Sequence, residues 1–423
     1  MKGESLNITQ DNLDKLQTLF PDIFTEGKID MEKFKATFSD DINFANERYV
    51  LNWAGKSDAF KVLQIPTTAT LKPQHDQSVN FDTTQNVFIE GENLEVLKVL
   101  QKSYYGKVRV VSIDPPYNTG SDSFIYPDSF KENKADYEKR IGDKDEEGYL
   151  MKEGLFRKNN KDSGHFHSNW LSMMYPRLFL AKNLLQENGV IFVHIDDNEV
   201  HNLRLLMNEI FGEENFITEI VWQRTFATKN DSKYFSTEHE YILLYAKSIS
   251  GLTINLLERG EKQNIRYQNP DNDERGPWTS TDLLRMEHRD NSVYTIVSPN
   301  GKEWTPQSGT SWRHPEKEML ELIANNEVTF GSDGNAKPRR KRFLSEVKQG
   351  IIPQTIWKHD EVSHTQEAKQ SLNKLFDGVP VFSTPKPIKL IKKMLQISTA
   401  KESNDFIVDF FAGSAATAEA VME

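Results

Sequence analysis

The sequence contains no cysteine. This absence excludes disulfide scaffolds, thiolate zinc sites, iron–sulfur clusters and cysteine nucleophiles. No stretch approaches the ~18 apolar residues of a membrane span, and the N-terminal residues form no apolar h-region, which argues against secretion and fits the cytoplasm. Positive charge is also not in excess, because 52 Lys and Arg against 63 Asp and Glu give a net charge of −11 over 423 residues. Contact with nucleic acid would therefore depend on local basic patches.

Strand and helix patterns alternate in two separate parts of the chain. The first part begins with a short apolar run at Asn86–Gly91, a helix at 92–104 and a buried strand at Val108–Ile113. A long helix is predicted from Asn169 to a C-cap at Gly189, where a second buried strand starts. Further elements of these kinds are predicted at 199–211, 216–222, 240–246, 385–397 and 404–409, with a last helix after a small-residue turn. This order predicts an α/β fold with a Rossmann-like sheet.

The patterns divide the chain into four segments. Residues 1–60 are acidic and predicted to form a helical N-terminal segment, with an accessory or dimer-forming role. Residues 61–247 and 380–423 carry the two parts of the α/β domain. Between them, 248–379 loses its periodicity and is predicted to be an inserted α+β domain. The densely charged stretch 131–162 is predicted to be an exposed loop, with a flap over a substrate as the alternative.

A tetrapeptide whose side chains could form a reactive site follows the first buried strand. Asp114, Pro115, Pro116 and Tyr117 come directly after Ile113. In open α/β sheets ligands bind beyond the carboxyl ends of strands. The prolines have no N–H, so we expect their carbonyls to face outward as acceptors beside the carboxylate, with a flat ring for stacking. Such a site suits a planar ring with an exocyclic amine, whereas an ordinary turn is the alternative.

A second loop follows the strand at 404–409. It consists mainly of small residues, which let a ligand approach the backbone closely. It matches neither G-x-G-x-x-G nor the P-loop pattern, so nothing supports ATP hydrolysis. Its residues of interest are Asp409, Phe411, Ala412, Gly413 and Ser414.

Together these segments resemble the β-group of amino-methyltransferases, and in detail the DNA-modification (Mod) subunit of type III restriction-modification systems. The matching segments, in chain order, are VFIEGENLEVLKVL, DPPYNTG, HSNWLSMMYPRLFLAKNLL, GVIFVHIDDNEVHNLRLLMNEIFG, TEHEYILLYAK, FSTPKPIKLI and FIVDFFAGSAATAEAV. The resemblance covers about Asn86 to Glu423. It implies an S-adenosylmethionine-dependent methyltransferase sheet, with a target-recognition domain in the irregular insert.

The resemblance also implies a reaction. A methyl group passes from S-adenosylmethionine to the N6 amine of an adenine flipped out of duplex DNA. Asp114 and the Pro115 carbonyl would accept hydrogen bonds from the amine, and Tyr117 would stack on the base. In this family, aspartate as the first motif residue favours adenine N6 over cytosine N4. The absence of cysteine separately excludes cytosine-C5 methylation, which needs a thiolate.

For the cofactor, the resemblance implies that the loop after residue 408 approaches the methionine end. Lys386 would neutralise a carboxylate at the helix start, with a solvated lysine as the alternative. Glu92 would reach the adenine end, although an acidic residue in the first turn of a helix is nearly as common. No metal is expected: Asp196 and Asp197, and likewise His165 and His167, are better explained as loop residues.

DNA contact is expected in the insert. The basic cluster consists of Lys337, Arg339, Arg340, Lys341 and Arg342. Phosphate contacts are favoured for this cluster, and an arginine on a guanine edge is a further option. A solvated basic loop is the alternative.

The resemblance implies partners as well: double-stranded DNA, a separate restriction subunit with helicase and nuclease functions, a homodimer of the full-length form, and the bacterial cytoplasm. In the family an acidic residue beyond the last helix usually holds the ribose, so the chain is expected to be truncated at Glu423. Three alternatives remain: a solitary or type II adenine methyltransferase, a non-catalytic DNA-binding remnant, and methylation of RNA or protein amide nitrogen. Asp114 counts against the last, since those enzymes usually carry asparagine there.

Overall fold

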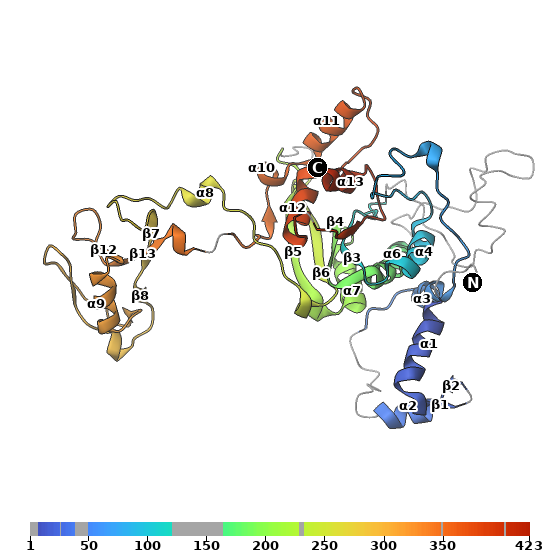
Figure 1. Ribbon diagram of the computed structural model, residues 1–423, viewed down its shortest axis with the longest axis horizontal. Helices are drawn as coiled ribbons and strands as arrows, with labels where there is room; N and C mark the ends of the chain where they lie inside the picture. Colours follow the sequence, from blue (N-terminus) through green and yellow to red (C-terminus); the bar gives the residue numbers. More distant parts are fainter. Residues whose placement is uncertain are drawn as a thin grey trace, which may run out of the picture. The chain divides into compact units, whose positions relative to one another are not determined.

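The computed structural model describes residues 7–25, 27–38, 50–120, 164–227, 232–347, 350–401 and 403–423. The chain divides into two compact units (Figure 1). Unit 1 comprises Met1–Asn255 and Gln354–Glu423, and unit 2 comprises Leu256–Pro353. The charged stretch predicted as a loop or flap at 131–162 lies outside the described residues.

Unit 1 is built on a six-stranded sheet with the order β14-β5-β6-β4-β3-β15. Strand β6 is antiparallel to both neighbours, whereas the β3–β4, β3–β15 and β5–β14 pairs are parallel. The strands are β3 (Val108–Ile113), β4 (Leu185–Ile195), β5 (Phe216–Gln223), β6 (His239–Ala246), β14 (Ile356–Trp357) and β15 (Phe406–Val408). The predicted α/β fold with a Rossmann-like sheet is confirmed.

Helices cover both faces of this sheet (Figure 1). One face packs on α4 (Asn93–Tyr104), α6 (Phe166–Leu184) and α7 (Val200–Phe211), with side chains such as Ile191 and Val193 in the main core. The other face carries α12 (Ile388–Ser398) and α13 (Ala416–Met422), and near them are the short α10 (His359–Val362) and α11 (Thr365–Leu375). Because alternate strand residues point to opposite faces, β3 and β4 are buried on both sides.

Two local predictions are wrong. Gly189 is no helix C-cap, because α6 ends at Leu184 and Gly189 lies inside β4. Glycine is required there by close approach: a β-carbon would lie 2.9 Å from the Val108 carbonyl of the adjacent strand. The apolar run at Asn86–Gly91 forms no strand, and Val87 and Phe88 are exposed because no neighbouring strand pairs with them.

Among its described residues, the N-terminal part of unit 1 is mostly helical. It contains α1 (Ile8–Leu19), α2 (Met31–Phe38) and α3 (Lys56–Gln64), together with a small hairpin of β1 (Phe24–Thr25) and β2 (Lys28–Ile29). Helix α3 packs against α6, which connects this region to the core. Within the described part of the chain, no helix has the length and apolar character needed to cross a membrane.

Unit 2 contains short strands and few helices. Its elements are α8 (Glu261–Asn264), β7 (Trp278–Asp282), β8 (Leu284–Arg285), β9 (Ile296–Val297), β10 (Glu303–Trp304), β11 (Ser311–Trp312), α9 (Glu316–Ala324), β12 (Val328–Thr329) and β13 (Arg339–Phe343). A small core forms around Trp312 and Met319. The insert was predicted at 248–379, but β14, α10 and α11 belong to unit 1, since β14 extends the central sheet beside β5.

Candidate functional site

Charged side chains from four strands meet at one edge of the central sheet. Asp114 follows β3 and Asp409 follows β15, two adjacent parallel strands, so both lie at their carboxyl ends. Strand β6 runs in the opposite direction, which brings its second residue, Glu240, to the same edge. Arg224 follows β5 and pairs with Glu240 at 2.6 Å.

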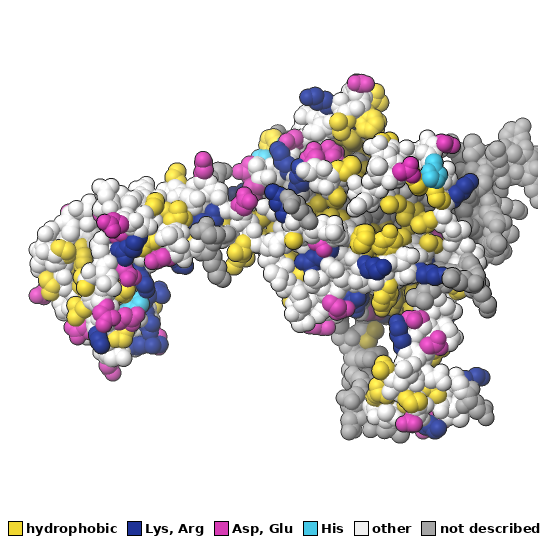
Figure 2. All heavy atoms as spheres, viewed as in Figure 1, with side chains coloured by type: hydrophobic (Ala, Val, Ile, Leu, Met, Phe, Trp, Pro, Cys, Tyr) yellow, Lys and Arg dark blue, Asp and Glu magenta, His cyan; other side chains and the backbone are white. Residues whose placement is uncertain are grey.

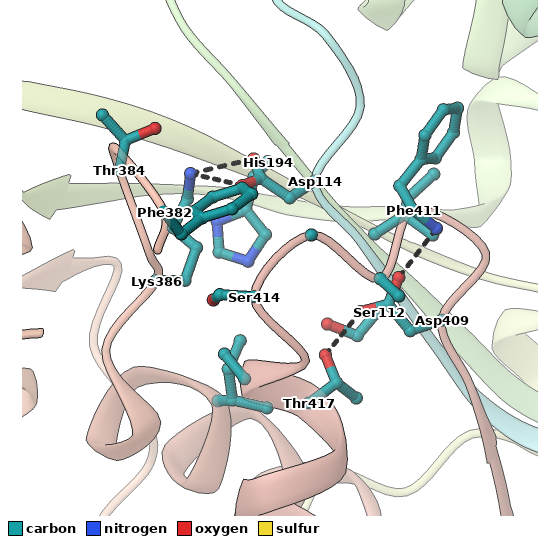
Figure 3. Close-up of a pocket in the computed structure, with 15 residues that line it drawn as sticks. Ser112, Asp114, His194, Phe382, Thr384, Lys386, Asp409, Phe411, Ser414 and Thr417 are labelled. Atoms are coloured by element: carbon teal, nitrogen blue, oxygen red, sulfur yellow. Dashed lines mark hydrogen bonds and ion pairs between the residues drawn. The ribbon is translucent and has the colours of Figure 1, made fainter. Parts of the chain in front are cut away.

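Lys386 lies between Asp114, which follows β3, and Glu240 of β6. Its ammonium lies 2.8 and 2.7 Å from the two carboxylate oxygens of Asp114 (Figure 3). It also lies 3.6 Å from Glu240. Burial alone would lower the pKa of Lys386, but Asp114 and Glu240 raise it above its ordinary value, so the side chain stays charged. In the structure the carboxylate partner of Lys386 is Asp114, at the end of β3.

Tyr117 belongs to the same network. Its hydroxyl lies 2.9 Å from Asp114 Oδ1 and 3.1 Å from Glu240 Oε2, and its single proton serves one of them at a time. The Lys386 ammonium lies 5.1 Å from the centroid of the Tyr117 ring. Burial, together with the two carboxylates, raises the pKa of Tyr117 well above 10, so the hydroxyl keeps its proton.

The two prolines differ from the prediction. Pro115 is buried, and Pro116 does not offer a free carbonyl, because the indole N–H of Trp170 donates to it at 2.7 Å. Trp170 lies on α6, so this bond fixes the loop after β3 against the neighbouring helix. The Pro116 carbonyl thus has a structural partner, and Asp114 remains the best-placed acceptor of the tetrapeptide.

The loop after β15 is held by Asp409. Its carboxylate accepts hydrogen bonds from the Phe411 N–H at 2.9 Å and the Thr417 hydroxyl at 2.7 Å. Burial raises the pKa of Asp409 to about 6, against the effect of these bonds. Gly413 adopts a φ of +51°, which favours glycine, and a β-carbon there would lie 3.4 Å from the Phe382 ring.

The loop and Asp114 line one pocket, whose volume of about 350 Å³ includes space open to solvent. The pocket brings together Asp114 and Lys386 with the predicted cofactor residues Asp409, Phe411, Ala412, Gly413 and Ser414. Residues that the sequence did not indicate also line it, namely Ser112, Ile113, His194, Phe382, Thr384, Ile391, Ala416 and Thr417. Ten of the lining residues are labelled in Figure 3.

Glu92 does not line this pocket. It is the N-cap of α4, where its carboxylate accepts from the Glu95 N–H at 3.0 Å, and it pairs with the buried Arg177. Its neighbour Asn93 donates to the Phe410 carbonyl at 2.8 Å and so ties α4 to the loop after β15. The helix-capping alternative describes what Glu92 does here.

Two site residues missed by the sequence analysis left a signal. His194 is a polar residue in the otherwise apolar strand GVIFVHI, and Glu240 is a carboxylate at the start of the buried strand EYILLYA. A buried polar group needs a partner or a function, so each departs from the pattern of a plain core strand. The convergence of Glu240 with Asp114 depends on the antiparallel placement of β6, whereas His194 reaches the site from β4, which is parallel to β3.

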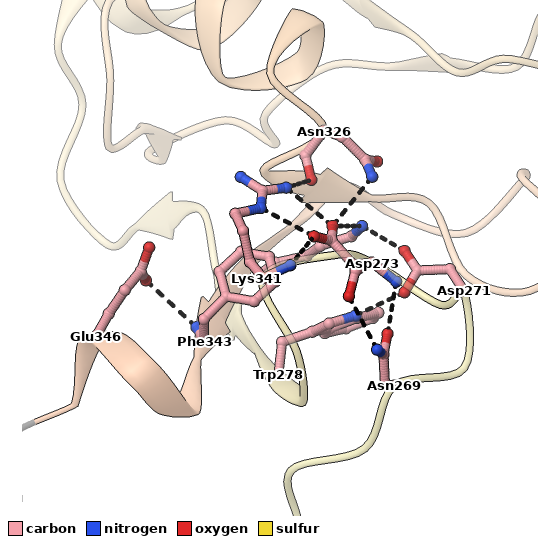
Figure 4. A network of polar contacts seen from close by, with 9 residues as sticks. Asn269, Asp271, Asp273, Trp278, Asn326, Lys341, Phe343 and Glu346 are labelled. Atoms are coloured by element: carbon pink, nitrogen blue, oxygen red, sulfur yellow. Dashed lines mark hydrogen bonds and ion pairs between the residues drawn. The ribbon is translucent and has the colours of Figure 1, made fainter.

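The basic cluster in unit 2 is not a free patch. Lys341 lies in the middle of β13, the central strand of a three-stranded sheet, and its side chain is 2% exposed. It pairs with Asp271 and with Asp273, the latter at 3.2 Å (Figure 4). Hydrogen bonds from Arg275, together with Lys341, hold the pKa of Asp273 well below its ordinary value. The predicted contact of Lys341 with DNA is therefore wrong, since acidic residues distant in sequence hold it inside the unit.

The other basic residues differ in how they are engaged. Arg339 donates to Ser280 Oγ at 2.8 Å, Arg340 lies 3.3 Å from Glu327, and Lys337 lies 3.4 Å from Asp282. Arg342 is exposed. Arg340 and Arg342 line a groove together with Thr281, Asp282, Leu283, Arg313, His314, Lys341 and Glu346. Lys and Arg side chains gather along one edge of this unit, among acidic side chains (Figure 2).

The acidic and histidine side chains do not cluster as metal ligands do in the part of the chain that the structure describes. Among the residues that the structure describes, no group of three or more His, Cys, Asp or Glu is placed to hold a metal ion.

Comparison with known proteins gives a family. Residues 108–423 match the family model described as DNA methylase. The chain is 36% identical to the type III restriction-modification enzyme StyLTI Mod subunit of Salmonella typhimurium, over 97% of this chain and 63% of that protein. It is 33% identical to the EcoPI Mod subunit of Escherichia phage P1 (96% and 66%) and 31% identical to the EcoP15I Mod subunit of Escherichia coli (96% and 67%).

The chain thus spans about two thirds of the length of these relatives. Among solved structures, a PvuII DNA methyltransferase described as cytosine-N4-specific overlaps with 77% of this chain and 75% of that chain, at 12% identity and a TM-score of 0.36. The family assignment rests on the sequence matches rather than on this distant structural likeness. The chain therefore belongs to the DNA methylase family, within which it groups with the Mod subunits of type III restriction-modification enzymes.

Proposed function

We propose that this chain methylates the N6 amine of adenine in duplex DNA with S-adenosylmethionine as the methyl donor. The observation that carries the proposal is the pocket shared by Asp114, at the end of β3, and the loop after β15. It supplies an acceptor for an amine next to a loop that a ligand can approach. Gly413 places no side chain in the space beside the Phe382 ring, and the buried His194 lines the pocket with no hydrogen-bond partner among the described residues, which suits a small polar ligand.

The residues of the site have distinct roles in this proposal. A carboxylate has about four acceptor positions, so Asp114 can accept from a substrate amine while it remains paired with Lys386. Lys386 and Tyr117 hold the carboxylate in place through an ion pair and a hydrogen bond. Asp114 then stabilises the positive charge that develops on the amine nitrogen.

The bound donor supplies a methyl group on a cationic sulfur. During transfer the nitrogen lone pair forms the new bond to carbon, and the electron pair of the broken bond stays on sulfur. The surplus proton leaves the nitrogen toward Asp114 or solvent. Because the base must leave the stack before Asp114 can reach it, the proposal includes base flipping, with Tyr117 as the stacking surface.

DNA contact is proposed for the groove of unit 2. Arg313 and Arg342 are exposed there, and His314 and Arg340 lie beside them. Lys337 and Arg339 remain candidates for phosphate contact at the edge of this groove, although each already has a partner within the unit. Contacts to phosphate would position the unit on the duplex, and contacts to base edges would select the site.

The sequence relationship supports a further assignment. We infer that the chain is the modification and recognition part of a type III system of the bacterial cytoplasm, acting beside a restriction subunit and as a homodimer. Co-purification with the product of an adjacent helicase-type gene, and the mass of the Mod chain by light scattering, test the two assemblies separately.

The enzymatic proposal is tested by transfer of tritiated methyl from S-adenosylmethionine to unmethylated genomic DNA. Digestion of the product identifies the modified base. N6-methyladenine is expected with the native chain and not with Asp114→Ala. Finding N4-methylcytosine instead would overturn the choice of base. No transfer to any base by the folded native chain would overturn the proposal.

A further inference from the structure

His194 is a buried polar residue whose ring has no partner. It lies near the end of β4, between the apolar neighbours Val193 and Ile195, and is 1% exposed. Neither ring nitrogen has a hydrogen-bond partner among the residues that the structure describes. Leaving a buried polar group unpaired typically costs about 1–3 kcal/mol, so such groups are rare without a water or a ligand.

The ring faces the pocket of the proposed active site. His194 lines it together with Asp114, Lys386, Asp409 and Ser414. Figure 3 shows the imidazole beside Lys386 and Phe382, among the side chains that surround the pocket. On the same strand face, Phe192 is also buried but does not line the pocket, so His194 is the position of β4 where this face meets the ligand space.

The imidazole is neutral in this setting. Burial, and after it the positive charge of Lys386, lowers the pKa of His194 to about 3, although Glu240 acts in the opposite direction. A neutral imidazole has one N–H donor and one acceptor nitrogen. It can therefore donate to a carboxylate or accept from an ammonium without adding charge to a pocket that already contains Lys386 and two carboxylates.

We propose that His194 binds the amino-acid end of the methyl donor, whose ammonium and carboxylate match the acceptor and donor of its ring. This inference rests on the proposed function, because it assigns a residue to the same pocket. The amino-acid end is favoured over the adenine ring because side chains with charged or hydroxyl groups line much of the pocket, namely Asp114, Lys386, Asp409, Ser112, Thr384, Ser414 and Thr417.

The test compares two ligands that differ only at that end. S-Adenosylhomocysteine carries the amino-acid group, and 5′-methylthioadenosine lacks it. Calorimetry is performed with the native chain and with His194→Phe, which keeps a flat ring without nitrogens. Loss of one hydrogen bond predicts about a tenfold weaker affinity for S-adenosylhomocysteine, with the affinity for 5′-methylthioadenosine unchanged.

Two further variants keep the result interpretable. His194→Asn retains a donor and an acceptor and is expected to recover part of the affinity, and it also serves if the phenylalanine variant fails to fold. Phe192→Leu changes the packing on the same face of β4 and is expected to leave the preference between the ligands unchanged. Since His194→Phe removes unpaired polar atoms, its melting temperature without ligand should equal or exceed that of the native chain.

The outcomes distinguish a failure of the proposed function from a failure of the role proposed for His194. If the native chain binds neither ligand, the proposed function fails. If it binds both and His194→Phe binds S-adenosylhomocysteine equally well, the function stands and the role of His194 is wrong. If His194→Phe weakens both ligands equally, the ring shapes the pocket without contacting the amino-acid end, which also overturns the proposal.

Discussion

Both units contain a buried lysine held between two carboxylates. In unit 1, Lys386 pairs with Asp114 and Glu240, and in unit 2, Lys341 pairs with two aspartates. Each ammonium also lies 5.1 Å from the centroid of an aromatic ring. The two arrangements use the same types of side chain, yet only the one in unit 1 adjoins the proposed active site.

The difference lies in what surrounds the carboxylates. The Asp114 side chain is 31% exposed and lines a pocket. The Asp273 side chain is 4% exposed and accepts further hydrogen bonds from Arg275 and Asn326. Asp114 can therefore accept a further hydrogen bond from a substrate, whereas the acceptor positions of Asp273 are occupied by partners within the unit. An ion pair becomes a reactive site only where its acceptor faces space that a ligand can enter.

The largest change in methyl transfer is expected for a substitution of Asp114, compared with the same substitution of Asp273. Asp114→Asn preserves the size of the side chain but removes its charge and one acceptor oxygen, so methyl transfer should fall about a thousandfold. Binding of S-adenosylhomocysteine should persist, because the loop after β15 is untouched. The matched variant Asp273→Asn should keep methyl transfer while weakening unit 2. Equal loss of transfer in both folded variants would contradict the distinction between the two lysine sites.

Replacement of the lysine by methionine should lower the stability of unit 2 more than that of unit 1. Lys341→Met leaves the buried Asp273 without its ammonium, which is expected to cost about 3 kcal/mol of local stability. Lys386→Met should cost about half as much, since Asp114 is partly exposed and Glu240 keeps Arg224. Hydrogen exchange measured separately on β13 and β3 peptides reports each unit. Lys337→Met, which removes the more exposed pair with Asp282, is the control and should change little.

The features that could be predicted from the sequence are each indicated by a pattern of a few neighbouring residues. Asp114 and the loop from Asp409 to Ser414 each follow an apolar strand directly, so their place at the sheet edge could be inferred without the fold. The order of strands and helices in unit 1 was predictable for the same reason. The bounds of the elements were less predictable than their types, since β4 begins at Leu185 rather than at Gly189 and the apolar run at 86–91 forms no strand.

The parts that the sequence did not predict depend on distant pairing. Glu240 meets Asp114 only because β6 is antiparallel to β4, and no local pattern states that direction. Lys341 was counted as part of a basic run, but Asp271 and Asp273, about 70 residues earlier, neutralise it. A charge count along the chain cannot detect such neutralisation, because it arises from the pairing of β13 with β7.

The third effect concerns pH and the loop of the pocket. Burial raises the pKa of Asp409 from 3.8 to about 6, so the folded chain binds this proton more tightly than the unfolded chain. Asp409 therefore stabilises the fold below about pH 4, and this contribution is lost as the pH rises through 6, a change of about 3 kcal/mol. The difference in free energy of unfolding between the native chain and Asp409→Asn should follow that course in denaturant titrations. A flat difference between pH 4 and 7 would show that the carboxylate is not desolvated as the structure indicates.

A smaller change is expected in DNA binding, where Arg342 and Lys341 of unit 2 can be compared. Arg342 and Lys341 are adjacent on β13, but Arg342 is exposed and lines the groove, whereas Lys341 is buried. If Arg342 contacts a phosphate, Arg342→Gln should weaken DNA binding by about 1 kcal/mol and reduce the slope of log affinity against log salt by about one unit. Lys341→Met should leave that slope unchanged, because a lysine neutralised inside the protein displaces no counterion from DNA. Salt titrations of binding to non-specific duplex measure both slopes, and a reduced slope for Lys341→Met alone would reverse the assignment of the two residues.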